Sequence, residues 1–236
     1  LNDYITDVRG TYLIHGITGS GKTEVYMEMI DAMLQRGKQC IVLIPEIALT
    51  YQTLLRFYKR FGDAVSVMHS RLSAGERYDQ MKRAKRGEVQ VMIGPRSALF
   101  TPFQKLGLII IDEEHETSYK SDSMPKYHAR EVAVHLAEMT DACVVMGSAT
   151  PSLEANYRAQ QGIYKKYVLS ERIGDAVLPE VQIVDMRQEL AGGNSSIFSR
   201  HLETAIADRL EKRQQVMLFL NRRGISGFVS CRACGY

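Results

Sequence analysis

Residues 16–23 of this chain combine glycines, a lysine and hydroxyl side chains at the spacing that binds the phosphates of a nucleoside triphosphate. The glycines let successive backbone N–H groups point at one phosphate, and the N-terminus of the helix expected to follow adds its positive dipole end. Lys22 can reach the β- and γ-phosphates, and the Thr23 hydroxyl can bind Mg²⁺. The loop therefore predicts a site for Mg²⁺ and ATP or GTP. Its residues are Gly16, Ile17, Thr18, Gly19, Ser20, Gly21, Lys22 and Thr23.

A second group of reactive side chains, residues 112–115, directly follows the apolar residues 106–111. Such a run predicts a strand buried on both faces of a parallel sheet, and ligand chemistry lies at the carboxyl ends of such strands. Asp112 can hold Mg²⁺ opposite Thr23, and Glu113 can orient and polarise the attacking water. A solvated acidic turn is the alternative, but the phosphate loop favours catalysis.

Composition limits the class of protein. The chain has 236 residues, of which 45% are hydrophobic and 24% charged, as in a globular protein with one full domain and part of another. The formal net charge of +3 is compatible with a polyanionic partner without indicating one. It contains no run of about eighteen apolar residues and no signal-like start, so we expect a cytoplasmic protein without a membrane partner. It does not begin with Met, and we expect an internal piece of a longer protein.

The four cysteines fall into two kinds. Cys40 and Cys143 lie in strand-like runs, where we expect small buried hydrophobic side chains. Cys231 and Cys234 form a C-x-x-C pair that is typical of half a four-cysteine zinc site. We expect Zn²⁺ in the full-length protein, with the remaining ligands supplied by residues beyond this sequence, whereas two reduced thiols are the alternative here.

The elements that must position these residues follow a simple alternation of strand-like and helix-like segments. This alternation predicts βαβ units and an α/β fold with a parallel sheet flanked by helices. Helices are predicted over residues 24–36 and 73–86, where Gly37 and Gly87 follow as stop signals. The predicted strands are residues 12–14, 41–44, 65–68, 89–93, 106–111 and 142–146.

We expect three parts along the chain. Residues 1–168 form the nucleotide-binding lobe, residues 169–180 a linker, and residues 181–236 the truncated start of a second α/β lobe. In the last part we expect strands over 181–184 and 216–220 and a helix over 200–214. These few elements cannot close a core of the usual size, so we expect this part to lean on the first lobe or to be poorly ordered.

With these motifs in hand, the chain resembles the superfamily 2 helicases, and within them the family of bacterial replication-restart helicases. The resemblance implies a RecA-like fold and an ATP-dependent 3′→5′ DNA helicase that uses Mg²⁺. It implies as partners single-stranded and forked DNA, other primosome proteins and single-stranded DNA-binding protein. It runs through residues 16–26, 45–50, 69–70, 94–100, 112–115, 118–120, 125–130, 147–151 and 221–224.

The resemblance also implies roles for residues outside the nucleotide site. Thr50, Arg96 and Ser97 follow strand ends and could contact DNA phosphates, a surface ion pair being the alternative for Arg96. Ser148 and Thr150 would bridge residues 112–115 to the opposite lobe. A helix N-cap at Ser148 or Ser152 is the alternative to that bridge.

His115 would relay the nucleotide state, or else be a hydrogen-bonded core residue. Between residues 115 and 147 lies an aromatic and basic stretch typical of a platform for stacking single-stranded bases. The resemblance gives this stretch the role of coupling DNA binding to hydrolysis. Alternatively, Tyr127 and His128 simply begin a helix that runs to Thr140. The stretch contains Tyr119, Lys120, Lys126, Tyr127, His128 and Arg130.

Two other functions stay open. The chain could belong to another superfamily 2 DNA translocase, or act as a nucleotide- and DNA-binding module without turnover. The resemblance places an arginine finger in late motifs that this sequence lacks, so we expect little activity from these 236 residues alone.

Overall fold

The computed structural model describes residues 9–173 and 179–219. The chain divides into two compact units, Leu1–Ala176 and Val177–Tyr236, which we describe separately. The division falls inside residues 169–180, and the assignment of the second unit to a second helicase lobe stays a prediction. Within the described ranges, no helix combines the length and apolarity that crossing a membrane requires.

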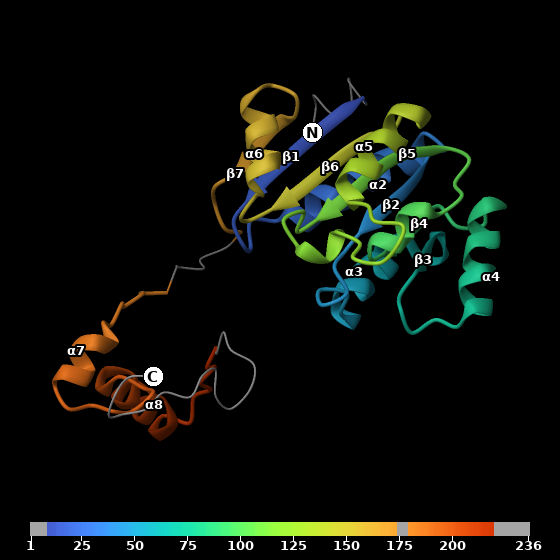
Figure 1. Ribbon diagram of the computed structural model, residues 1–236. Coiled ribbons are helices and arrows are strands. Elements are labelled where there is room, and N and C mark those ends of the chain that lie inside the picture. Colours follow the sequence, from blue (N-terminus) through green and yellow to red (C-terminus); the bar gives the residue numbers. More distant parts are fainter. Residues whose placement is uncertain (1–8, 174–178, 220–236) are drawn as a thin grey trace. The chain divides into compact units, whose positions relative to one another are not determined.

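The first unit is built on one seven-stranded sheet in the order β3-β4-β2-β5-β6-β1-β7, in which every pairing is parallel (Figure 1). This is the predicted parallel α/β sheet. β7 was missed, because its mostly exposed residues lack the apolar run that marks the central strands. The strands are β1 Gly10–Gly16, β2 Gln39–Leu43, β3 Val65–Val67, β4 Val91–Gly94, β5 Leu106–Asp112, β6 Cys143–Ser148 and β7 Lys165–Leu169.

Helices cover both faces of this sheet (Figure 1). Leu108 and Ile110 pack in the layer under α2 and α3, whereas Ile109 and Ile111 pack in the layer under α4, α5 and α6. The alternation explains why the central strands are apolar at every position. The helices of this unit are α2 Lys22–Gln35, α3 Tyr51–Phe61, α4 Ala74–Lys85, α5 Ala129–Thr140 and α6 Leu153–Gln160, with the 3₁₀ turns η1 Gly62–Ala64, η2 Arg96–Phe100 and η3 Thr117–Tyr119.

Local signals set most helix ends. Ser73 and Glu76 form a capping box at the start of α4, as the sequence of this segment predicts. The alternative in which Tyr127 and His128 begin the helix that runs to Thr140 holds in part, because His128 is the N-cap of α5 and the helix ends at Thr140. The His128 Nδ1 accepts the Arg130 N–H at 3.2 Å, whereas Tyr127 lies before the cap. Cys40 and Cys143 are fully buried in β2 and β6, as predicted.

The second unit contains α7 Met186–Ala191 and α8 Arg200–Glu211, the latter close to the predicted helix. The strand predicted over 181–184 is wrong, and residues 216–219 form no strand either. Ile183 is 95% exposed and Phe219 87% exposed. An apolar run becomes a strand only when it has a neighbour to pair with, and no strand is described in this unit.

Candidate active site

The phosphate loop joins the end of β1 to the start of α2. Gly21 stands at the N-cap of α2 with a φ of +85°, a conformation that other residues rarely adopt. A Cβ on Gly16 would lie 2.6 Å from the Ser20 hydroxyl oxygen. That hydroxyl is buried and has no hydrogen-bond partner among the described residues. A buried donor without a partner beside a helix N-terminus fits a phosphate oxygen.

The loop opens onto a pocket of about 510 Å³. The pocket brings together Lys22 and Thr23 from the start of α2 with Asp112 and Glu113 from the end of β5. Lys22 Nζ donates to the Gly16 carbonyl at 2.6 Å, which holds the ammonium group inside the loop. The residues lining the pocket are Thr18, Gly19, Ser20, Gly21, Lys22, Thr23, Glu24, Arg56, Asp112, Glu113 and Ile173.

Asp112 has a partner that the sequence analysis missed. The Tyr26 hydroxyl on α2 donates to Asp112 Oδ1 at 3.1 Å. A Cβ on Gly147 would fall on this hydroxyl, so only glycine at that position lets Tyr26 reach the carboxylate. Burial, followed by the charge of Glu113, raises the pKa of Asp112 to about 6, and burial keeps the pKa of Tyr26 well above its ordinary value. Tyr26 therefore stays a donor.

Glu113 adopts a left-handed backbone conformation with a φ of +47°. Such a conformation is uncommon for residues other than glycine and recurs at functional sites. It turns the chain at the end of β5, so that Glu113 lines the pocket while the next residue leaves it. The Glu113 carboxylate lies 3.7 Å from His115 Nδ1.

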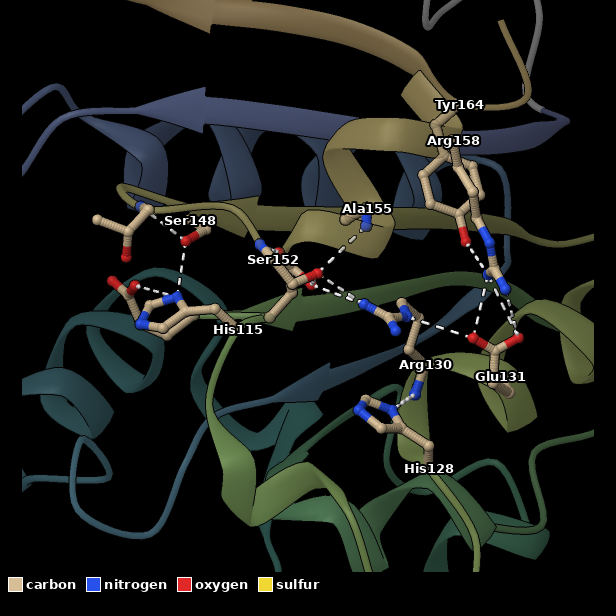
Figure 2. A network of polar contacts seen from close by, with 12 residues as sticks. His115, His128, Arg130, Glu131, Ser148, Ser152, Ala155, Arg158 and Tyr164 are labelled. Carbon is tan, nitrogen blue, oxygen red and sulfur yellow. Dashed lines mark hydrogen bonds and ion pairs between the residues drawn. The ribbon is translucent and has the colours of Figure 1, made fainter. Parts of the chain in front are cut away.

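His115 connects this turn to the end of β6. Its Nδ1 lies 2.7 Å from the Ser148 hydroxyl, which also accepts the Thr150 N–H at 2.9 Å (Figure 2). Of the two residues predicted to bridge from residues 112–115, Ser148 therefore contacts His115 directly, and Thr150 is linked to it only through Ser148. The N-cap alternative is wrong for Ser148 but holds for Ser152, whose hydroxyl accepts the Ala155 N–H at the start of α6.

Two residues of the predicted DNA platform are buried, which corrects their assignment as stacking or contact residues. Tyr119 is 1% exposed, and its hydroxyl lies 2.6 Å from the Asp112 carbonyl and 3.0 Å from the Leu43 carbonyl. Arg130 is also buried and forms an ion pair with Glu114. Because both side chains fill polar positions in the interior, only an indirect coupling role is left for them.

Arg96 binds backbone rather than a carboxylate. Its Nη1 donates to the carbonyls of Ser118 and Lys120 at 2.7 and 2.8 Å, so the surface ion pair predicted as an alternative is wrong. Ser97 is exposed, and so is Thr50, whose hydroxyl caps α3. Both hydroxyl residues therefore lie at the surface, where a phosphate could reach them.

The exposed part of the platform contains an aromatic pair. The Tyr127 ring meets the Phe100 ring edge-on, with 5.3 Å between centroids and 80° between planes. Phe100 is 55% exposed and was not singled out from the sequence, although it ends η2 directly after Arg96, Ser97 and two buried residues. Burial, followed by the Arg130 charge, lowers the pKa of His128, consistent with a neutral ring that caps α5. Lys120 and Lys126 are exposed.

Cys231 and Cys234 lie outside the described residues. Within residues 9–173 and 179–219, no group of three or more His, Cys, Asp or Glu side chains is arranged to hold a metal ion. The zinc prediction is therefore left as it stands.

Comparison with known proteins identifies the family to which the chain is similar. The family model for DEAD/DEAH box helicases matches residues 4–158. Replication restart protein PriA of Bacillus subtilis (strain 168) is 53% identical over 98% of this chain and 29% of its own length. PriA of Synechocystis is 52% identical over 95% of this chain and 28% of its own length, and PriA of Treponema pallidum is 44% identical over 99% and 35%. The chain thus spans about a third of the curated relatives it matches, and the predicted resemblance to replication-restart helicases is confirmed.

Solved structures confirm the fold. RecG bound to a three-way DNA junction superposes with a TM-score of 0.52 at 22% identity, over 73% of this chain and 23% of that one. The Mss116p DEAD-box helicase domain 2, bound to an RNA duplex, gives a TM-score of 0.51 at 10% identity, over 70% of this chain and 65% of that one. At these sequence identities the structural similarity supports the RecA-like α/β fold and nothing about function.

Proposed function

The chain belongs to the DEAD/DEAH box helicase family, and we propose that it is the nucleotide-binding part of an ATP-dependent 3′→5′ DNA helicase that acts in replication restart. One observation carries the proposal. Lys22 and Thr23 from the phosphate loop face Asp112 and Glu113 across a single pocket, as phosphoryl transfer to water requires.

The roles at this site follow from chemistry and position. Lys22 and the loop N–H groups bind the phosphates of ATP. Thr23 and Asp112 would hold Mg²⁺, which would supply positive charge beside the phosphates. Glu113 orients the attacking water and accepts its proton, since it lines the same pocket and Asp112 is engaged with Tyr26. Substrate positioning and charge stabilisation supply most of the acceleration in such reactions.

His115 transmits the change between the ATP-bound and ADP-bound states of the site to the end of β6. Its ring lies between Glu113 and Ser148, so a change at the water-activating carboxylate is felt at the end of β6. Ser148 and Thr150 carry that change toward the opposite lobe. The arginine finger that completes the reaction belongs to residues outside these 236, and we expect weak hydrolysis from this chain alone.

Single-stranded DNA lies along the carboxyl ends of β2 and β4 in this proposal. Thr50 and Ser97 are exposed there and contact phosphates without reading sequence. Tyr127, with Phe100 against its ring, offers a surface on which a base can stack, and Lys120 and Lys126 add positive charge. Arg96 supports this surface by holding the backbone of Ser118 and Lys120.

We extend the proposal to the partners expected of a replication-restart helicase. These are forked DNA, other primosome proteins and single-stranded DNA-binding protein, in the bacterial cytoplasm where the chromosome is replicated. Zn²⁺ at Cys231 and Cys234, with further cysteines from the full-length chain, belongs to the same proposal.

The proposal is tested with the full-length chain that carries this segment. ATP hydrolysis is measured with and without single-stranded DNA, and unwinding is measured on duplexes with a 3′ or a 5′ single-stranded tail. We expect stimulated hydrolysis and unwinding from the 3′ tail alone. ATP-dependent movement without unwinding would identify another superfamily 2 translocase, and nucleotide binding without hydrolysis would identify a binding module; either result contradicts the proposal.

A further inference from the structure

Glu114 is the member of residues 112–115 that faces away from the nucleotide pocket. Its side chain has no exposed surface, and its carboxylate accepts three hydrogen bonds. The donors are the Ser152 N–H at 2.6 Å, the Ser152 hydroxyl at 2.9 Å and Arg130 Nη1 at 3.2 Å (Figure 2). Arg130 Nη1 also donates to the Ser152 hydroxyl at 2.8 Å. Three elements thus meet at one buried carboxylate: the turn after β5, the start of α5 and the start of α6.

Arg130 is the second residue of α5 and follows residues 120–128, which we call the coupling loop. The base of this loop is closed on itself. Lys120 and His128 pair as an antiparallel bridge, and the Ser121 N–H donates to the Tyr127 carbonyl at 2.8 Å. Its tip is open to solvent, with Met124 83% exposed. The base therefore holds the loop together, while the exposed tip is accessible to a partner.

The residues that flank the coupling loop on both sides form hydrogen bonds to residues 112–115. At the first end, Tyr119 donates from its hydroxyl to the Asp112 carbonyl. At the second end, Arg130 reaches Glu114, two residues further along the same turn. The loop is therefore linked through its flanking residues to the backbone of Asp112 and to the side chain of Glu114.

We propose that Glu114 and Arg130 are positioning residues that transmit displacement of the coupling loop to Glu113 and to the turn that carries Ser148 and Ser152. The inference rests on the proposed function, because it names the link by which DNA stimulates hydrolysis at that site. Neither side chain lines the nucleotide pocket, and both are buried. Glu114 and Arg130 act by setting the positions of the Glu113 and Ser148 side chains.

Folding stability alone does not explain why Glu114 and Arg130 form a buried ion pair. A buried ion pair gains about as much from attraction as it loses by desolvation, and apolar replacements of similar volume are often as stable. Directional contacts to three elements are something that an apolar cluster cannot supply. The pair can therefore be removed as a unit to separate transmission from folding.

The decisive variant is the double substitution Glu114→Gln with Arg130→Met in the full-length chain. We expect cooperative unfolding close to that of the wild type and DNA affinity, measured by anisotropy of a labelled oligonucleotide, within about twofold. Stimulation of ATP hydrolysis at saturating DNA should fall by about fivefold or more, the size of a typical coupling between sites. Each single substitution should be less stable than the double, since it leaves one buried group without its partner.

Three further variants distinguish transmission from general damage. Arg60→Met breaks ion pairs with Glu28 and Asp31 that share no residue with the contacts of Glu114 and Arg130, and should leave stimulation unchanged. Tyr127→Ala should raise the DNA concentration needed for half-maximal stimulation, because it removes a stacking surface. Arg130→Lys keeps the buried charge but lacks the guanidinium plane that places Nη1 between Glu114 and Ser152, and should lose part of the stimulation even if the double variant folds poorly.

Full stimulation in a folded double variant, or in Arg130→Lys, would overturn the inference. So would a loss of basal and stimulated rates in equal proportion, since that outcome describes a structural role. An absence of stimulation in the wild type would instead contradict the proposed function, so the two failures are distinguishable.

Discussion

Residues 112–115 present two sides that differ in burial and in partners. On the cradle side, Asp112 and Glu113 line the nucleotide pocket, and the Glu113 side chain is 34% exposed. On the relay side, Glu114 has no exposed side-chain surface, and His115 contacts Ser148. The left-handed conformation of Glu113 separates the two sides within one turn, while the Glu114 N–H still bonds to the Gly147 carbonyl of β6.

The difference teaches that adjacent carboxylates need not share a role. Asp112 and Glu113 are open to substrate and contribute negative charge to the reaction. Glu114 is closed to solvent and holds neighbouring elements in position. Changes on the cradle side should therefore affect nucleotide binding and the chemical step, whereas changes on the relay side should affect the response to DNA.

Lys22→Ala should have the largest effect and sharpen the comparison most. It removes the ammonium group that the loop holds for the phosphates, so ATP hydrolysis in the full-length chain should fall by about a hundredfold or more. Steady-state hydrolysis and nucleotide binding are the measurements. Lys59→Ala, at an exposed position on α3, is the matched control and should behave as the wild type.

Asp112→Asn should reveal how much folding stability is lost by burying the ionised Asp112 carboxylate. Because the folded-state pKa of about 6 lies above the ordinary value of 3.8, folding binds protons, and stability falls as the pH rises from about 4 to about 6. The amide removes this cost. Without nucleotide, the variant should be more stable than the wild type by about 2 kcal/mol near pH 7.5 and gain little near pH 4.

Denaturant titrations of the 236-residue chain at the two pH values measure this effect. Asp63→Asn, at an exposed position, should change stability by less than about 0.5 kcal/mol at either pH. Equal stability of Asp112→Asn and the wild type at both pH values would mean that the carboxylate is not destabilised by burial.

Tyr26→Phe should have the smallest effect and test whether the cradle side is organised from α2. Loss of the hydrogen bond to Asp112 should weaken Mg²⁺-dependent ATP binding by roughly tenfold. The ratio of DNA-stimulated to basal hydrolysis should not change, because the relay side is untouched. A fall in that ratio with normal ATP binding would break the separation of the two sides. Tyr12→Phe, whose hydroxyl bonds to the Arg9 carbonyl, is the control.

The parts that could be predicted from sequence are those whose signal is local. The phosphate loop is one contiguous segment, and the central strands are apolar at every position because both faces are covered. The contacts of Tyr26, Glu114 and Arg96 could not be predicted. Each joins segments far apart in the chain, and the packing of α2, α5 and η2 on the sheet decides them.

Two errors have the same physical origin. Tyr119 was predicted to stack on DNA because its neighbours are basic, but its hydroxyl reaches the carbonyls of Leu43 and Asp112 at the carboxyl ends of β2 and β5. Residues 181–184 were predicted to form a strand from their apolar side chains, but no strand is described beside them. Composition describes a residue's preference, whereas its partners decide its position.

The separation of binding from chemistry on the cradle side is tested most directly by Glu113→Gln in the full-length chain. ATP affinity and single-turnover hydrolysis are measured together. If Glu113 accepts the proton of the attacking water, the variant should bind ATP within about threefold of the wild type, while hydrolysis falls by about a hundredfold or more. Near-normal hydrolysis in this variant would contradict the account, because it would remove Glu113 from the chemical step.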